Sequence, residues 1–428
     1  MLMPSSFVDW RRATVATLLT TSILFAPAGR AADSLTLEAA QQLALQRDPA
    51  IQQLSAQTTE VRDAADASGQ WPDPKVSLGL VNLPTNSYAV GRDSMTMQVV
   101  GLEQDFPAGD TRSLSEARGQ QLADAQAARV KDRKLGVVRD VRKAWFDLYY
   151  AEHALPLVQQ SEQVFQQLLD IAKVRYANGQ GGEQELARAE LEMGMLQERE
   201  LEFNADIDAA RAALAKFVGD EAASEPLADD LPALPRPPEQ AELLKGLPQH
   251  PRIIAANTEV AAADTATDIA RQAYKPVWGV DLSYGRRPGG DPTGMPYTNM
   301  FTAMVSVSVP LFTGDRQDRS VSAARAASSA AQYAVDDELR ELKQMLDTDW
   351  AHWEHLGHIR DLYAKTILPS SSLNTEATLS AYKNGSADFD ELARAQISDL
   401  DSRTQQLKAD VDYLDMQAEL LYLAGEQP

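Results

Sequence analysis

The feature that most constrains this chain is an internal repeat with a period of about 200 residues. Eight short motifs of the first half return in the same order in the second half, and their separation grows only from 202 to 206 positions. Pro74, for example, returns as Pro276, and Trp145 returns as Trp350. A long repeat of this kind is typical of a duplicated structural unit. The sequence therefore predicts two copies of one fold joined in a single chain.

The composition of the chain marks the borders of these units. Residues 1–31 contain an arginine pair, then an apolar run of about 16 residues, then small residues, which is the order of a secretory signal peptide. The run is shorter than the roughly 20 residues of a membrane-spanning helix, but an N-terminal membrane anchor stays open as the alternative. A proline-rich stretch at 225–238 has the composition of a linker. We therefore expect the two units at residues 32–224 and 239–428.

Charge and cysteine content exclude several classes of function. The 428 residues include 62 acidic and 40 basic side chains, and the resulting net charge of −22 argues against nucleic acid as a partner. The chain has no cysteine, so disulfides, thiol catalysis and cysteine-ligated metals are excluded. For the same reason we expect no lipid anchor of the kind that is attached at a cysteine.

Each copy has the same order of secondary-structure signals: a helical pattern, two strand-like runs, a very long helical pattern and a return helix. In the first copy these lie at 36–68, 75–83, 94–106, 110–178 and 184–217. In the second copy they lie at 239–273, 277–286, 300–312, 315–384 and 388–424. The long helix would measure about 100 Å, and the two shorter helices of a copy together have almost that length. We therefore expect one long helix beside two shorter helices stacked end to end, with the strands at one end and an Asn-Gly turn at the other.

Helices of this length must bury their apolar stripe against other long helices. A fibrous coiled-coil rod would achieve this and stays open as the plainer alternative. The strand runs argue for something else, because Val305, Val307 and Val309 alternate with small polar residues. An apolar outer row opposite a polar inner row suits a membrane barrel. Four strands are too few to close a barrel, so several chains would have to combine.

The chain resembles the TolC-type outer-membrane efflux proteins over nearly its whole length after residue 31. The resemblance rests on the duplicated unit, on Phe-Pro or Val-Pro strand exits followed by Gly-Asp, and on Tyr-x-Asn-Gly turns ahead of Leu-Ala-Arg-Ala. It implies a mainly α-helical fold with a β-barrel contribution. In a homotrimer, each chain would give four strands to a twelve-stranded barrel within outer-membrane lipid, and its helices would form a periplasmic tunnel.

The same resemblance implies a passive exit duct of a tripartite efflux system, set in the outer membrane with a long periplasmic part. Its partners would be a periplasmic adaptor, or membrane fusion protein, and an inner-membrane pump, for which the RND type is expected. The strand exit Phe-Pro-Ala-Gly-Asp suggests the heavy-metal branch and hence metal resistance, but metal ions, drugs and proteins stay open as substrates. The alternatives are a duct for type I protein secretion and a periplasmic coiled-coil scaffold without a barrel.

The two Asn-Gly turns are the expected working end of the molecule. The resemblance places adaptor docking at Asn178, Gly179, Asn384 and Gly385. It places a gate in the tyrosines and carboxylates that flank these turns, which are Tyr176, Tyr382, Glu183, Glu185, Asp388, Asp390 and Glu391. We expect a hydrogen bond from Tyr382 to Glu185 that holds the tunnel shut.

A simpler interpretation of the carboxylates also stays open. Acidic residues are favourable in the first turn of any helix, because they face the positive end of the helix dipole. Some members of the family carry a basic residue just after the second glycine, where this chain has Ser386 and Ala387. The details of the network are therefore expected to differ here.

Motifs that carry chemistry are otherwise sparse. His352, His355 and His358 recur at every third position of a predicted helix, a spacing that suits a shared metal ion. An ordinary solvated or interhelical face explains the same spacing better. The chain has no His-Glu-x-x-His motif, phosphate-binding loop, catalytic triad or dinucleotide fingerprint. We therefore expect no enzymatic activity and no cofactor.

Overall fold

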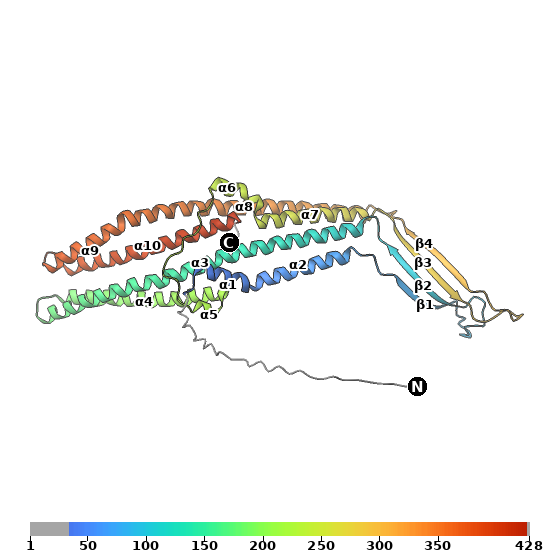
Figure 1. Ribbon diagram of the computed structural model, residues 1–428, viewed down its shortest axis with the longest axis horizontal. Coiled ribbons are helices and arrows are strands. Elements are labelled where there is room, and N and C mark those ends of the chain that lie inside the picture. The colour runs from blue at the N-terminus through green and yellow to red at the C-terminus, as the bar shows by residue number, and fades with distance from the viewer. Residues whose placement is uncertain (1–33, 426–428) are drawn as a thin grey trace, which may run out of the picture.

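The computed structural model describes residues 34–425, so the predicted signal peptide lies outside the described residues. The molecule is elongated (Figure 1). Long helices run side by side along it, and a four-stranded sheet occupies one end. The turns between α3 and α4 and between α9 and α10 both lie at the opposite end, which we call the tip.

The first unit follows the predicted order and ends with one additional short helix. Its elements are α1 (Leu37–Arg47), α2 (Pro49–Ser68), β1 (Lys75–Val81), β2 (Met97–Phe106), α3 (Thr111–Ala177), α4 (Glu183–Val218) and α5 (Asp220–Ala223). After α5 the chain is irregular as far as Glu239, and Leu35 forms a parallel bridge with Leu227. The proline-rich stretch is therefore packed against the start of the first unit rather than free of it.

The second unit repeats this order with more interruptions. Its elements are α6 (Gln240–Gly246), η1 (Leu247–Gln249), α7 (Pro251–Gln272), β3 (Val277–Arg286), β4 (Met300–Ser308), α8 (Gln317–Leu362), η2 (Tyr363–Ile367), α9 (Leu368–Lys383) and α10 (Phe389–Ala424). η2 is a π-helical turn, so the run predicted as one long helix consists of three segments.

Two boundaries differ from the prediction because of proline. The pattern over 36–68 is two helices, since the residue before Pro49 is pushed out of the helical region. That residue, Asp48, has an extended backbone and caps α2, and its carboxylate accepts a hydrogen bond from the backbone N–H of Ile51 at 2.8 Å. His250 stands in the same position before Pro251 and separates η1 from α7.

The long helix of the first unit lies in the middle of the molecule. Toward the tip, α3 contacts α4 on one side and α10 on the other, and α10 contacts α9 (Figure 1). Toward the sheet, α3 contacts α2 and α7, and α7 contacts α8. Each long helical run thus lies beside two shorter helices, as their lengths predict. The lateral edges of this helical layer are α2 and α4 on one side and α8 and α9 on the other.

The buried core lies in clusters along this layer. One cluster joins α1, α3 and α4 around Trp145 and Phe146. A second lies near the tip and includes Phe165 of α3, Leu196 of α4 and Leu392 of α10. A third joins the second unit to α3 through Leu135 and its neighbours on α10. Such clusters between helices are how long helices obtain stability without a globular centre.

The sheet has the antiparallel order β1-β2-β3-β4, so both units contribute to it. Cross-strand pairs such as Val100 with Tyr284 and Val280 with Val305 place apolar side chains in one row. That row is largely exposed in the single chain, for example Leu78 at 78% and Val305 at 61%. β1 and β4 are the free edges. In the described part of the chain, no helix combines the length and apolar character needed to cross a membrane.

Candidate functional site

The two tip turns have the same backbone geometry. Asn178 and Asn384 end their helices at φ near −90°, and Gly179 and Gly385 both follow at φ +73°. This left-handed conformation is strained for any residue with a Cβ, which explains the glycine at both positions. A Cβ at either glycine would meet no atom within 4 Å, so the requirement comes from the backbone and not from crowding.

Hydrogen bonds tie each turn to the last turn of the preceding helix in the same way. The N–H of Gln180 donates to the carbonyl of Arg175 at 2.8 Å, and the N–H of Ser386 donates to the carbonyl of Ala381 at 2.9 Å. This is the pattern by which a glycine C-cap satisfies carbonyls at a helix end. The tip therefore presents two matching, well-defined turns side by side.

The helices that leave the turns begin differently. The carboxylate of Asp388 accepts a hydrogen bond from the N–H of Glu391 at 2.8 Å and so caps α10. Its counterpart at the start of α4 is Gly182, which has no side chain to do so. The simpler interpretation thus accounts for Asp388 as a helix cap. Glu183, Asp390 and Glu391 lie in the first turns of their helices, where the dipole favours them, and their gating role stays a prediction.

Tyr382 and Glu185 come from different units and lie together at the tip. The hydroxyl of Tyr382 donates to Glu185 Oε1 at 3.1 Å. The guanidinium of Arg175 lies 3.8 Å from Glu185 Oε2 and 6.0 Å from the centre of the Tyr382 ring. Burial and the negative charge of Glu185 raise the pKa of Tyr382, against the opposing charge of Arg175. The phenol therefore stays neutral and able to donate.

Arg175 was not predicted as part of the site, because the resemblance places the basic residue just after the second glycine. It lies three residues before the first Asn-Gly turn, and Ala381 occupies its place in the second unit. The other predicted tyrosine, Tyr176, is 46% exposed, and Glu391 is exposed as well. The structure thus brings together only one of the two equivalent tyrosine–glutamate pairs within the chain.

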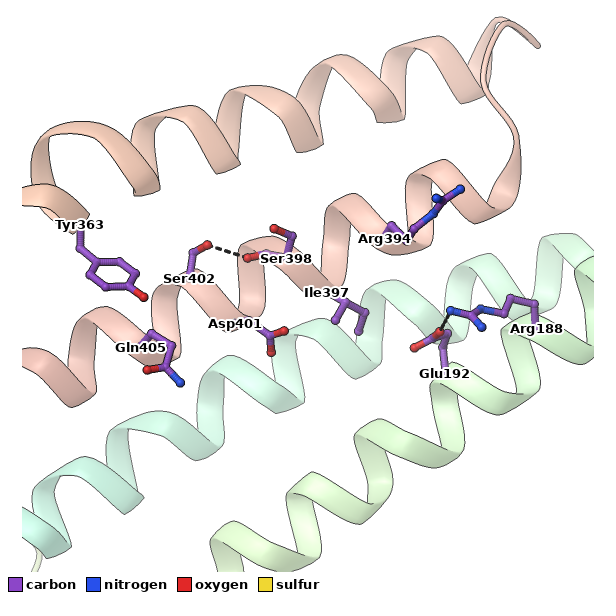
Figure 2. Close-up of a pocket in the computed structure, with 9 residues that line it drawn as sticks. All are labelled: Arg188, Glu192, Tyr363, Arg394, Ile397, Ser398, Asp401, Ser402 and Gln405. Carbon is purple, nitrogen blue, oxygen red and sulfur yellow. Dashed lines mark hydrogen bonds and ion pairs between the residues drawn. The ribbon is translucent and has the colours of Figure 1, made fainter. Parts of the chain in front are cut away.

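A groove separates α4 from α10 behind the tip and measures about 380 Å³ (Figure 2). Arg188 of α4 and Arg394 of α10 occupy equivalent places in the two Leu-Ala-Arg-Ala motifs, and both line the groove. Arg188 pairs with Glu192 at 2.6 Å, whereas Asp401 pairs with Arg199 across the groove at 2.6 Å. The groove is therefore polar and charged, and residues of both units line it.

A second groove lies beside the turn of the second unit, between α9 and α10. Small side chains line much of it, including Ala377, Ala381 and Ala387. Together with the exposed Asn-Gly turns, these grooves make the surface of the tip uneven.

The three histidines show no arrangement for metal binding. His352, His355 and His358 are exposed on α8. Within residues 34–425, no three histidine, aspartate or glutamate side chains gather as metal ligands. The geometry gives the metal interpretation of this spacing no support.

Comparison with known proteins agrees with this architecture. The family model described as "outer membrane efflux protein" matches residues 40–220 and 245–426. The curated protein BepC of Brucella suis biovar 1, also described as an outer membrane efflux protein, is 23% identical over 279 residues, which are 63% of this chain. The match spans 61% of BepC, less than two thirds of its length.

Two solved structures have closely similar folds. A membrane protein from Pseudomonas aeruginosa superposes with a TM-score of 0.79 at 15% identity, covering 91% of this chain and 90% of that one. The outer membrane protein VceC from Vibrio cholerae has a TM-score of 0.76 at 16% identity, covering 91% and 96%. At these identities the likeness establishes the fold alone.

Proposed function

We propose, because this chain belongs to the outer membrane efflux protein family, that it is the exit duct of a tripartite efflux system. In this role it passes substrate from an inner-membrane pump and a periplasmic adaptor to the outside of the cell. The duct performs no chemistry, and the energy comes from the pump. Family membership itself assigns the chain to the outer membrane and to efflux.

The observation that carries the proposal is the unfinished sheet. Its apolar row, with Leu78 on β1 and Val305 on β4, is exposed, and both edge strands lack a partner within the described chain. An exposed apolar face with open edges is unstable in water but suits a closed barrel in lipid. A homotrimer would supply twelve strands and close it. The opposite row, which includes Gly79, Gly101 and Ser306, would line the interior.

The tip is the proposed docking and gating end. Asn178, Gly179, Asn384 and Gly385 would meet the adaptor, and the grooves beside them would receive its hairpin. The bond from Tyr382 to Glu185 would hold the two units together in the closed state. In a trimer each tip carboxylate occurs three times around the axis, which would favour the passage of cations over anions.

The partners and the substrate follow from the family as proposals only. An adaptor of the membrane fusion type and a pump of the RND type fit the role, and a duct for type I protein secretion is the second candidate. The heavy-metal branch stays a proposal, since a passive duct receives its substrate from the pump. A soluble scaffold is disfavoured by the exposed apolar row of the sheet.

Fractionation and electrophoresis test the duct directly. We expect a detergent-requiring, heat-modifiable trimer in the outer membrane, and cation-selective conductance after reconstitution in a planar bilayer. A soluble, monomeric product would contradict the proposal. The docking role is tested separately with Gly179→Val and Gly385→Val, which strain the turn backbone without a clash. Both should weaken adaptor binding, and unchanged pump-dependent resistance would contradict the docking role.

A further inference from the structure

Each unit has a joint at which the end of its return helix meets the residues before a helix that begins with proline. In the first joint, Arg47 Nη1 donates to the carbonyl of Val218, the last residue of α4, at 2.6 Å. The next residue, Asp48, caps α2 and pairs with Arg133 of α3 at 2.6 Å. Burial opposes the charge of Asp48, but the hydrogen bonds from Arg133 and from the N–H of Ile51 lower its pKa. The first joint therefore consists of side chains that stay charged at neutral and weakly acidic pH.

The second unit builds the equivalent joint with a single imidazole. His250 occupies the position of Asp48, directly before a proline, and is only 3% exposed. Its Nδ1 accepts a hydrogen bond from the N–H of Arg252 at 3.4 Å and so caps α7. Its Nε2 lies 3.2 Å from the carbonyl of Tyr422, in the last turn of α10. In this second joint, one ring thus makes the two contacts that Arg47 and Asp48 share in the first.

The two contacts of His250 determine its protonation state. The carbonyl of Tyr422 can only accept a hydrogen bond, so Nε2 carries the proton and donates it. The N–H of Arg252 can only donate, so Nδ1 must keep its lone pair. The ring is therefore neutral when the joint is closed. A second proton, on Nδ1, would remove the acceptor that caps α7 and would place a positive charge at the positive end of the helix dipole.

Charged and titratable groups of four helices surround the second joint. They are Asp132 and Arg139 of α3, Arg252 of α7, Glu338 and Glu341 of α8, and Tyr422 of α10. Burial lowers the pKa of His250 below its ordinary value of 6.5, and the charge of Arg252 acts in the same direction. Asp132 and the carbonyl of Tyr422 act against this change without reversing it. The ring is therefore neutral at neutral pH, and a falling pH works against the closed joint.

We propose that His250 is an acid-sensitive latch, which releases the end of α10 from the start of α7 as the pH falls while the first joint stays closed. α10 runs without a break from Phe389 at the tip to Ala424, so the latch restrains the far end of a tip helix. The inference goes beyond the proposed duct and does not depend on it, because all the contacts of the latch lie within one chain.

The size of the effect follows from proton linkage. When the joint is open, the ring takes up a proton below about pH 6.5, its ordinary pKa, whereas the ring in the closed joint resists protonation. Acid therefore favours the open joint. Because a single proton is involved, the ratio of open to closed joints should rise by at most about tenfold per pH unit below pH 6.5.

Amide hydrogen exchange of the purified full chain in detergent, measured by mass spectrometry from about pH 7.5 to about pH 5, tests the latch. After correction for the intrinsic pH dependence of exchange, opening should increase below pH 6.5 in peptides of residues 251–258 and 418–425. The equivalent peptides of the first joint, residues 49–56 and 212–219, are the internal control and should show no such increase. Asp415 of α10 cannot mimic the result, because burial raises its pKa and its protonation favours the folded chain. An equal increase at both joints, or none at the second, overturns the latch.

Two histidine variants assign the effect to one ring. His250→Asn keeps a side-chain acceptor for the cap but takes up no proton in this range, so it should abolish the pH dependence at the second joint. His355→Asn, at an exposed position of α8, is the matched control and should leave the dependence unchanged. A dependence that persists in His250→Asn overturns the latch.

A measurement on the parent chain covers the case in which His250→Asn does not fold. The slow exchange of the ring Cε1–H with solvent, followed by mass spectrometry across the same pH range, reports the pKa of an individual histidine. For His250 we expect a pKa below 6.5, because the closed joint holds the neutral ring. A pKa at or above 6.5 overturns the latch, whatever the variants show.

Discussion

The two units carry the same elements, but their long helices differ in continuity and in burial. α3 is helical from Thr111 to Ala177 without a break, whereas its counterpart contains the π-helical turn Tyr363–Ile367. Trp145 and Trp350, before this turn, are 205 positions apart, while Tyr176 and Tyr382, after it, are 206 apart. A π-helical turn accommodates one extra residue in an α-helix. The second unit therefore absorbs an added residue inside a helix and still reaches the tip in phase.

Burial differs because the units occupy different places in the layer. α3 has neighbours on both sides and many buried residues. α9 lies at an edge, and none of its residues is buried in the single chain. Equivalent segments of the two units therefore differ in burial because they occupy different places in the helical layer. The exposed edge at α9 is where we expect a neighbouring copy.

The largest effect is expected where the two tryptophans are compared. Trp145 is fully buried, and its Nε1 donates to the carbonyl of Leu35 at 3.2 Å. Trp145→Ala should lower the free energy of unfolding by about 3–5 kcal/mol. Trp350 is only partly buried, beside Trp353, so Trp350→Ala should cost clearly less. Denaturant unfolding measures both variants. Equal losses of unfolding free energy would contradict the claim that the two tryptophans differ in burial because their units occupy different places in the layer.

The second prediction compares the two faces of one strand. Val305→Arg places a charge in the outward apolar row and should cost about 2–4 kcal/mol in a bilayer. Ser306→Arg, on the opposite face, is the matched control and should be tolerated while it alters conductance. The yield of heat-modifiable trimer reports the difference. A reversed order would show that the proposed outer and inner faces are exchanged.

The third prediction concerns a buried acid that only the second unit has. Burial and the nearby Asp147 raise the pKa of Asp415 on α10 to about 8, and Ala209 stands in its place on α4. The unfolded chain loses this proton near its ordinary pKa of about 4, whereas the folded chain keeps it until about pH 8. Stability should therefore fall as the pH rises across this window, by at most about 1.4 kcal/mol per pH unit.

Unfolding of the parent and of Asp415→Asn at several pH values checks this prediction. The variant should lose the slope, because asparagine cannot ionise. Ala209→Asn, at the equivalent exposed place on α4, is the control and should leave the slope unchanged. An identical pH profile in Asp415→Asn would assign the dependence to other groups.

The smallest effect is expected at the tip. Tyr382→Phe removes one hydrogen bond to Glu185, worth about 1 kcal/mol, and should raise the probability that the reconstituted duct is open. Tyr176→Phe is the matched control and should have a weaker effect, because Tyr176 is 46% exposed and lies outside the contact between Tyr382 and Glu185. Single-channel recording compares the two. Equal effects of the two variants would contradict a role for the bond from Tyr382 to Glu185 in closing the duct.

Local signals in the sequence were sufficient to predict most of the helices and strands. Asn178 and Asn384, each followed by glycine, end their helices where expected, and the predicted strand Val277–Arg286 has the observed bounds. The break at Asp48 was missed because the helical pattern continues on both sides of Pro49. The π-helical turn was missed because one added residue looks the same as a drift in the repeat offset.

The site was predicted less completely, since its contacts join distant parts of the chain. The bond from Tyr382 to Glu185 was expected from the resemblance, and the structure places these residues together. The contribution of Arg175 and the exposure of Tyr176 depend on which unit lies inside the layer. The repeat in the sequence predicts the same elements for both copies, but it does not indicate which copy lies inside the helical layer.

The π-helical turn also has a consequence for the gene, because it lets the two halves of the coding sequence differ in length by one codon. An unabsorbed extra residue would rotate everything after it by about 100° and would turn Tyr382 away from Glu185. The turn takes up that rotation, so the two halves of a duplicated gene can differ by one codon within a helix and still encode the same tip. Insertion or deletion of a single codon in this segment was thus a change that selection could accept.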